Sequence, residues 1–403
     1  MNALLSFIEK LLTVIFTLGF GALAVVILIR CHGGPEEDLG SWTHVQKQRS
    51  IEAYLEFLRR CQSCPHEQDA MVALDQLQRE RGLVARLARD HLDDRASIAW
   101  PAFSPDGQVV LAAGGDRPGL WEADTGKPLP LGADAFQVQA GANIESLAYA
   151  EDGGRIAAGF SGWQGGAVQA WDRRSGESLG YFTLEDYDVK VVAFAPQGSA
   201  IGWLAQGPVG LWNPATGDLL RASHEGASDL AFLPADGGGG SMLTAAGREL
   251  WFWDPASLEL VRQLRIGSDR ALLGLSRDGR LVAYREGPVL ELWDTQDGVL
   301  RATLDDHDGE VTAFCREAGK GRVVVGTQAG TLYLWDPGPP ALLGRVPAHE
   351  GPVEQLACAA KGRVASISWD SAKIWDLEKL ARASPRSPAG LKPGGPARAS
   401  APQ

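Results

Sequence analysis

The chain has 403 residues, enough for more than one small domain or for a single repeat fold of about 250–300 residues. Its formal net charge of −12 repels phosphate backbones and argues against general nucleic-acid binding. The 49 glycines and 13 tryptophans suit tight turns between aromatic-rich strands better than they suit helices.

The first predicted element is an apolar segment, residues 11–29, which contains no charged side chain. As a helix it would be about 28 Å long, close to the roughly 30 Å of bilayer hydrocarbon. The alternative is a secretory signal, whose apolar core is shorter, about 7–15 residues, and is followed by small residues. Here Arg30 precedes Cys31, which also argues against lipoprotein processing. We therefore predict an uncleaved transmembrane anchor over residues 1–32.

The orientation of this anchor rests on few charges. Lys10 stands on its N-terminal side, and Arg30 on its C-terminal side is followed by three acidic residues. The bias in positive charge is therefore small. We expect a single-pass membrane protein with a cytoplasmic N-terminus, which places the rest of the chain on the non-cytoplasmic (periplasmic) side.

Residues 33–81 are predicted to form a juxtamembrane linker and a short helical hairpin. Residues 33–40 are mostly polar and include three glycines and a proline, which is typical of a linker. Two stretches then have apolar residues at helical spacing. They are Ile51, Tyr54, Leu55 and Leu58 in the first, and Met71, Leu74 and Leu77 in the second, after Pro65. A lone hairpin buries little surface, so we expect it to pack on another part of the chain or on a partner.

The five cysteines are an odd, sparse set, which does not indicate a disulfide framework. Cys61 and Cys64 are either two thiols in the turn between the helices or a reversible disulfide in an oxidising compartment. Pro65 displaces the histidine that a c-type haem site would need, and a zinc site lacks further ligands nearby. Cys315 and Cys358 fall in strand-like runs and are interpreted as small buried apolar residues. No cofactor and no metal site is expected.

A period near 40 residues governs the rest of the chain. Tryptophan followed by an acidic or amide residue recurs at intervals of 50, 41, 41, 40, 42 and 40 residues. These tryptophans are Trp121, Trp171, Trp212, Trp253, Trp293, Trp335 and Trp375. A four-stranded propeller blade repeats at about 40–45 residues, so the period predicts seven blades. The longer first interval predicts an insertion of about nine residues between the first two.

Each unit has the same internal order of strands and turns. A first strand leads to a turn with glycine at its end, as in Ser104-Pro105-Asp106-Gly107. Glycine there supplies the positive φ of a tight hairpin. A strand of small residues follows, then the strand that ends in tryptophan, and then a second glycine turn such as Asp124-Thr125-Gly126.

These residues closely resemble the WD-repeat family, over about residues 97–380. The resemblance implies an all-β fold, a seven-bladed β-propeller. It also implies a histidine ahead of the first strand of a blade, a position that His224, His307 and His349 occupy. In the family this histidine joins a hydrogen-bond network with a turn aspartate and the tryptophan. The last blade fits this best, with His349, Asp370 and Trp375; in the sixth, Ala329 replaces the aspartate, and we expect an incomplete network.

The ring of blades must close, and the family usually completes its last blade with a strand from before the first. Residues 82–87 either form that strand or finish the second helix of the hairpin. We assign residues 82–383 to the propeller. Residues 384–403 carry three basic residues, no acid and almost no large apolar residue, so they are expected to be disordered. The predicted fold is thus a propeller preceded by a transmembrane helix and a helical hairpin.

The resemblance implies a platform that binds partner proteins and supports assembly of a complex, with no enzymatic activity. No nucleophile motif, phosphate loop or metal signature competes with this interpretation. A ligand-sensing propeller is the alternative, followed by an enzyme whose site lies in the central channel. We expect other proteins as partners, membrane proteins among them, and the bilayer itself through residues 11–29.

Three residues are candidates for the partner-binding surface. Trp163 and Trp369 lie in matching turns of the second and seventh blades, and Arg117 lies at the same level of the first. Ring closure would bring these turns into one arc. Tryptophan and arginine are enriched at binding hot spots. The competing interpretation is that either tryptophan folds back over its own blade.

Overall fold

A computed structural model describes residues 35–61, 64–88, 98–114, 117–130, 135–138, 143–162, 165–196, 200–234, 240–369 and 371–383. The chain divides into two compact units, Met1–Leu77 and Gln78–Gln403. The predicted anchor over residues 11–29 lies outside the described residues, as do residues 384–403. Among the helices that are described, none combines the length and the apolar character needed to span a bilayer.

The first unit is helical. Its helices are α3 (Pro35–Gln48), α4 (Ile51–Arg60) and the greater part of α5 (Glu67–Glu80). The two helices predicted for this segment are therefore present as α4 and α5. The linker predicted over residues 33–40 is wrong from Pro35 onward, because proline suits the first turn of a helix and the three acids after it favour a helix N-terminus.

Helix α4 begins at a serine cap and buries one apolar face. The Ser50 hydroxyl accepts a hydrogen bond from the Ala53 amide at 3.1 Å. Trp42 of α3 packs edge-on against Tyr54 and stacks on His66 at 5.0 Å between ring centroids. A disulfide joins Cys61 at the end of α4 to Cys64 before α5, which settles the two alternatives for these thiols in favour of the disulfide.

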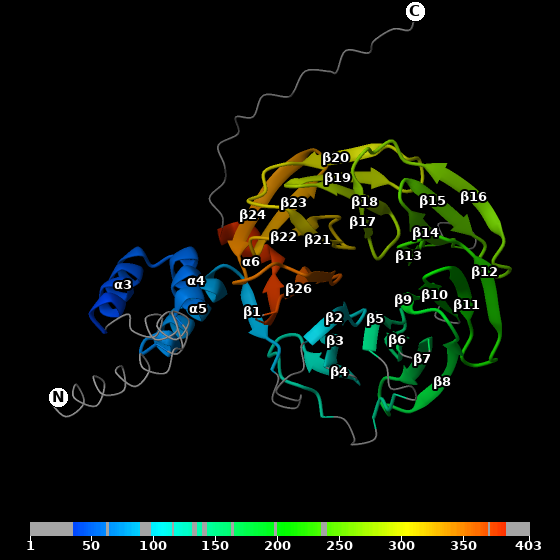
Figure 1. The fold of residues 1–403 in the computed structure, drawn as a ribbon, viewed down its shortest axis with the longest axis horizontal. Coiled ribbons are helices and arrows are strands. Elements are labelled where there is room, and N and C mark those ends of the chain that lie inside the picture. Colours follow the sequence, from blue (N-terminus) through cyan, green and yellow to red (C-terminus); the bar gives the residue numbers. More distant parts are fainter. Residues whose placement is uncertain are drawn as a thin grey trace, which may run out of the picture. The chain divides into compact units, whose positions relative to one another are not determined.

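The second unit is a ring of seven antiparallel sheets, which we number as blades 1 to 7 (Figure 1). Blade 1 consists of β2 (Ile98–Phe103), β3 (Val109–Gly114) and β4 (Arg117–Glu122). Blade 2 consists of β5 (Asn143–Tyr149), β6 (Arg155–Ser161), β7 (Gly166–Asp172) and β8 (Ser178–Leu184). Blade 3 consists of β9 (Val189–Phe194), β10 (Ile201–Ala205), β11 (Pro208–Trp212) and β12 (Leu219–Ser223). Blade 4 consists of β13 (Asp229–Phe232), β14 (Met242–Ala246), β15 (Glu249–Trp253) and β16 (Leu260–Arg265). Blade 5 consists of β17 (Ala271–Leu275), β18 (Leu281–Glu286), β19 (Val289–Asp294) and β20 (Leu300–Leu304). Blade 6 consists of β21 (Val311–Arg316), β22 (Val323–Thr327), β23 (Thr331–Pro337) and β24 (Pro340–Pro347). Blade 7 consists of β25 (Gln355–Cys358), β26 (Arg363–Ile367), β27 (Ala372–Asp376) and β1 (Leu83–Arg86). Helix α6 (Leu377–Ala383) follows β27.

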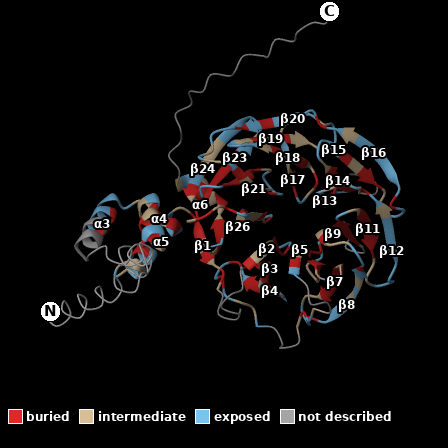
Figure 2. Cartoon of the chain, in the orientation of Figure 1, coloured by how far each residue is buried: buried red, intermediate tan, exposed pale blue. Residues whose placement is uncertain are grey.

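Burial follows the position of a strand within its blade. The second strand β10 is buried along its whole length, because other blades cover both of its faces. The outer strands β12 and β16 are almost wholly exposed (Figure 2). The core of the propeller therefore consists of the layers between adjacent blades. The predicted seven-bladed, all-β architecture is confirmed.

Blade 7 is completed by β1. Of the two alternatives for residues 82–87, a closing strand or the end of the second helix, the closing strand is confirmed. β1 pairs antiparallel with β27, and Leu83 lies opposite Trp375. The amide of Leu87 continues the pairing by donating to the carbonyl of Ala372 at 2.9 Å. Gly82 has φ of +116°, and a Cβ there would approach the carbonyl oxygen of Asp376 to 2.8 Å. The turn into the closing strand therefore requires glycine.

The residues that lead into β1 are also held by blade 7. The side chain of Gln78 is fully buried and donates to the carbonyl oxygen of Ala348 at 3.0 Å. Lys373 of β27 is buried as well and donates to the same carbonyl at 2.5 Å. These bonds fix the start of the second unit to the blade that closes the ring.

Blade 1 accounts for the long first interval between tryptophans. It has three strands, and a short run at Lys127–Leu129 stands in place of a fourth, with the Leu129 amide donating to the Leu120 carbonyl at 2.8 Å. Part of the following insertion packs on blade 2. There Phe136 is buried and meets Trp171 edge-on at 6.2 Å. The insertion thus covers the neighbouring blade.

Candidate interaction surfaces and central channel

The repeated tryptophans lie in the layers between blades. Trp121, Trp171 and Trp375 are fully buried. Trp212, Trp253 and Trp335 are at most 6% exposed, and Trp293 is partly buried. Side chains in these positions hold the blades together and cannot reach a partner.

In blade 7 a histidine network reaches the tryptophan through a serine. The Ser366 hydroxyl accepts from Trp375 Nε1 at 2.9 Å and bonds His349 Nε2 at 2.8 Å. The Ser371 hydroxyl lies 3.3 Å from His349 Nδ1, on the other side of the ring. Asp370, which the sequence pattern assigned to this network, lies outside the described residues.

Blade 6 builds its network by a different route. Trp335 Nε1 donates directly to His307 Nε2 at 3.2 Å. The other ring nitrogen of His307 bonds the backbone carbonyl of Pro288 at 2.5 Å. The carboxylate of Asp308 accepts instead from the hydroxyls of Thr327 at 2.8 Å and Thr331 at 2.5 Å. These bonds agree with the incomplete histidine network that Ala329 led us to expect.

His224 has a third kind of surrounding, in blade 4. Its ring lies 4.2 Å from that of Trp251, while Trp253 Nε1 donates to the Thr244 hydroxyl at 2.9 Å. Burial lowers the pKa of His224, which keeps its ring neutral. The three histidines are thus parts of the blade framework.

The turn between β26 and β27 exposes a large aromatic side chain. Trp369 is 59% exposed, more than any other aromatic residue among the exposed hydrophobics of the described chain. One side of its indole covers Gly351, where a Cβ would overlap the ring nitrogen. Both interpretations of this tryptophan therefore hold in part, since it lies on its own blade and still presents most of its surface to solvent.

The other two candidate residues belong to equivalent turns. Arg117 is exposed at the start of β4, opposite Gly114, in the β3–β4 turn of blade 1. Trp163 lies outside the described residues, between β6 and β7 of blade 2. The topology therefore places the three turns on the same rim in consecutive blades 7, 1 and 2.

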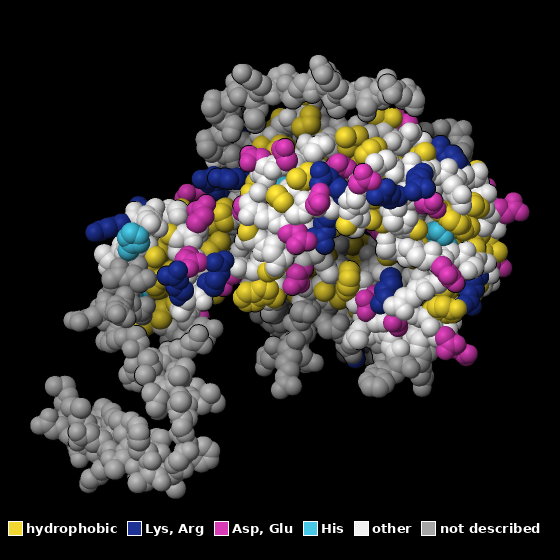
Figure 3. Space-filling model, turned by 45° about the horizontal axis from the view of Figure 1, so that its top comes forward, with side chains coloured by type: hydrophobic (Ala, Val, Ile, Leu, Met, Phe, Trp, Pro, Cys, Tyr) yellow, Lys and Arg dark blue, Asp and Glu magenta, His cyan; other side chains and the backbone are white. Residues whose placement is uncertain are grey.

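A second group of exposed apolar residues follows the outer strands. It comprises Leu219 and Leu220 on β12, Leu260 and Val261 at β16, and Val299 and Leu300 at β20. Each pair precedes an arginine that is engaged within the chain; Arg262, for example, lies 4.1 Å over the ring of Phe252. Apolar side chains form small groups between charged ones on the face seen in Figure 3.

The centre of the ring contains a cavity of about 280 Å³, lined by the first strands of six blades. Four polar residues in it use their side chains to link one blade to the next. The Thr312 hydroxyl of blade 6 donates to the carbonyl of Val353, ahead of blade 7, at 2.6 Å, and the other three accept from backbone amides. Ser146 accepts from the amide of Val192 at 3.1 Å, Asp229 from that of Leu275 at 2.6 Å, and Gln355 from that of Trp100 at 2.5 Å. The pairs of blades are 2 and 3, 4 and 5, and 7 and 1. All three residues stand three positions before the end of their strand.

Asp229 is the one ionisable residue among those that line the cavity. Burial raises its pKa to about 6, although the amides of Leu275 and Leu230 donate to the carboxylate and oppose the change. Asp229 is not among the residues singled out from the sequence. The sequence feature that points to it is a polar residue at the same position of the first strand in several repeats, where the rest of the strand is mostly apolar.

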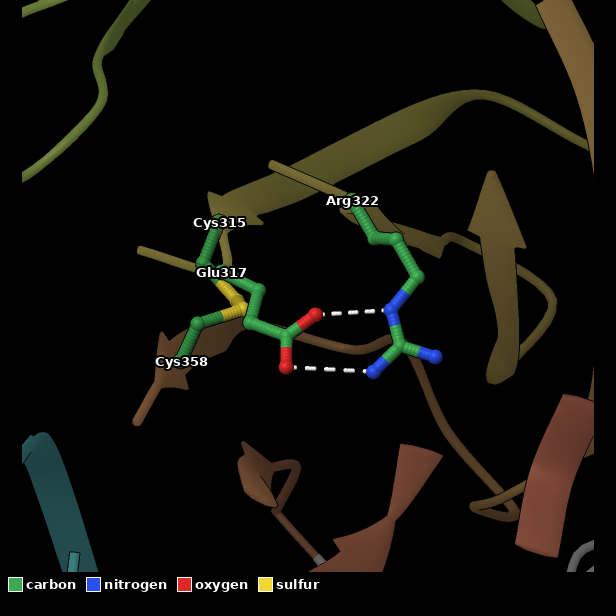
Figure 4. The surroundings of a disulfide bond; sticks show 4 residues. All are labelled: Cys315, Glu317, Arg322 and Cys358. Carbon is green, nitrogen blue, oxygen red and sulfur yellow. Dashed lines mark hydrogen bonds and ion pairs between the residues drawn. A yellow bond between two sulfur atoms is a disulfide. The ribbon is translucent and has the colours of Figure 1, made fainter. Parts of the chain in front are cut away.

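The cysteines of the propeller are bonded to each other, which corrects their interpretation as buried apolar residues. Cys315 on β21 and Cys358 on β25 form a disulfide between blades 6 and 7 (Figure 4). They are 43 residues apart, about one repeat, so they occupy neighbouring places on adjacent first strands. Their spacing in the sequence could have indicated this bond, because residues one repeat apart face each other across two adjacent blades.

A buried ion pair lies beside this disulfide. The guanidinium of Arg322 donates to both carboxylate oxygens of Glu317, at 2.7 and 3.1 Å, and the two side chains are 8% and 2% exposed. Arg322 also lies 2.8 Å from Glu378 of α6, which Lys320 contacts at 2.7 Å. The pair therefore connects the last helix of the propeller to blade 6.

Within the described ranges, no group of three or more histidine, cysteine, aspartate or glutamate side chains could hold a metal ion. The chain matches no family model and no curated protein. The fold and its surfaces define the chain as a seven-bladed β-propeller, a class that commonly serves as a scaffold for protein interactions.

Proposed function

We propose that this protein is a membrane-tethered platform of the WD-repeat type, which binds partner proteins and supports assembly of a complex. The observation that carries the proposal is the exposure of Trp369, at 59%, on the rim turn next to that of Arg117. Exposing a large indole to water is unfavourable for the free monomer, and tryptophan is enriched at interface hot spots.

The WD-repeat assignment rests on the repeated residues and their surroundings. The tryptophans of the period lie between blades, and two of them bond a histidine or a serine that in turn bonds a histidine. The turn glycines have positive φ, as at Gly107 and Gly126. These features support a ring of equivalent units whose turns are free to vary for binding.

Separate observations support the proposed tether and the proposed location. Residues 11–29 are long and apolar enough for one bilayer crossing. The two disulfides support a location outside the reducing cytosol, because disulfides persist in oxidising compartments. We infer a propeller on the non-cytoplasmic side of the membrane, with partners that include membrane proteins and exclude nucleic acid.

The test is to replace Trp369 and Arg117 by alanine, singly and together, and then with Trp163 as well. Partners cross-linked in membranes and purified with the full-length chain are quantified by mass spectrometry. Each key residue is expected to cost about 1 kcal/mol or more of affinity, and the triple variant to lose most of the partner. The melting temperature should change little, because both described side chains are exposed.

Tyr181→Ala provides the matched control, since this aromatic residue is 51% exposed but lies on outer strand β8. It should recover as much partner as the wild-type chain. Full partner recovery by a folded triple variant would show that the interface is not on this rim.

A further inference from the structure

The central cavity is lined by both polar and apolar side chains and by one ionisable group. Trp100, Leu147, Leu273 and Phe314 are among the residues that line it, from four different blades. Asp229 is the single ionisable residue of the lining. The described groups donate two hydrogen bonds to its carboxylate, whereas a carboxylate has about four acceptor positions. The cavity therefore contains an anionic group with acceptor capacity to spare.

Described cations of the surrounding strands are engaged elsewhere. Lys190 of β9 lies 3.8 Å from Glu145 and 3.9 Å from Asp188, and Arg316 of β21 pairs with Asp278. The other ionisable groups of these strands are Glu145 and Tyr149 on β5, with Arg277 just beyond β17 donating to the Tyr149 carbonyl at 3.3 Å. Strands β2, β10, β14 and β17 carry none. A buried carboxylate without a paired cation is costly, and a bound cation would remove that cost.

Trp100 adds a second, independent feature. Its φ is +55°, a left-handed conformation that is strained for a bulky residue. The backbone amide of Trp100 donates a hydrogen bond to the side-chain oxygen of Gln355 in blade 7, which holds Trp100 in this conformation at the wall of the cavity. Strained residues of this kind concentrate at binding sites, and the face of an indole attracts cations.

From these observations we propose that the central channel binds a small organic ammonium ion, whose charged group bonds Asp229 and whose apolar part lies against Trp100 and Phe314. A volume of about 280 Å³ is just below the range of small-molecule sites, about 300–1,000 Å³. The ligand is therefore an amine of about one ring. The site is separate from the rim, so it does not depend on the proposed partner surface.

The test uses benzylamine with its neutral and anionic counterparts, benzyl alcohol and benzoate, on the purified full-length chain. Binding is measured by calorimetry and by saturation-transfer NMR. Benzylammonium should bind at least tenfold more tightly than the alcohol, and benzoate should not bind. Because burial raises the pKa of Asp229 to about 6, affinity should fall about tenfold from pH 7 to pH 5 as the carboxylate is protonated.

Asp229→Asn should abolish the preference for the ammonium ion and its pH dependence. The matched control is Asp306→Asn, an identical change at an exposed position of the loop before blade 6, which should bind as the wild type does. If Asp229→Asn is unstable, the pH dependence of benzylammonium binding to the wild-type chain still tests the proposal. Equal binding of amine and alcohol, or a flat pH profile, would overturn the proposal, whatever the rim variants do.

Discussion

Replacing Arg322 by methionine is expected to lower the free energy of unfolding by about 3–5 kcal/mol. The change leaves the Glu317 carboxylate, whose side chain is 2% exposed, without its bidentate partner. Desolvation then opposes folding with no compensating attraction. Chemical denaturation of the full-length chain, followed by circular dichroism, measures the effect.

Two further variants show whether the loss comes from the buried charge. Glu317→Leu combined with Arg322→Met removes both charges and should regain most of the stability. Lys320→Met removes an ion pair to Glu378 whose side chains are 60% and 42% exposed, so it should cost about 1 kcal/mol or less. Equal losses for Arg322→Met and Lys320→Met would contradict a buried pair at this position.

Removing the disulfide between blades 6 and 7, by Cys315→Ala with Cys358→Ala, should cost roughly 2–4 kcal/mol. The bond closes a loop of 43 residues and so restricts the unfolded chain far more than the three-residue loop of Cys61 and Cys64 does. Denaturation midpoints with and without a thiol reductant measure this contribution.

Reduction should lower the wild-type midpoint to that of the double variant and leave the variant nearly unchanged. The matching pair Cys61→Ala with Cys64→Ala should behave like the wild type, including the loss on reduction. A wild-type midpoint that does not respond to complete reduction would show that the bond contributes no stability.

The number of blades could be predicted because each blade is one local unit with its own tryptophan and turns. The closing strand was harder to recognise, since β1 has only four residues and directly follows α5. Its short apolar pattern also fits a last helical turn. Pairing with β27, almost 300 residues away in the sequence, decides between the two, and no local pattern reports it.

The chemistry at the centre depends on contacts between blades, which the period encodes only indirectly. Cys315 and Cys358 are one repeat apart, and Ser146, Asp229 and Gln355 share one register. Aligning the blades by register, rather than each strand by its composition, would have indicated the disulfide and the channel acid. The anchor over residues 11–29 and the role of Trp163 stay predictions, because both lie outside the described residues.

The rim arc and the channel both require a ring that β1 closes against β27. Ala85 and Ile374 are directly opposed across these strands. The most direct test is to oxidise the full-length variant Ala85→Cys with Ile374→Cys and to map its disulfides by mass spectrometry. The closed ring predicts an intramolecular bond between these positions and none when Ala85→Cys is combined with Val209→Cys of blade 3. Failure of the first pair to cross-link in a folded chain would contradict the closed propeller.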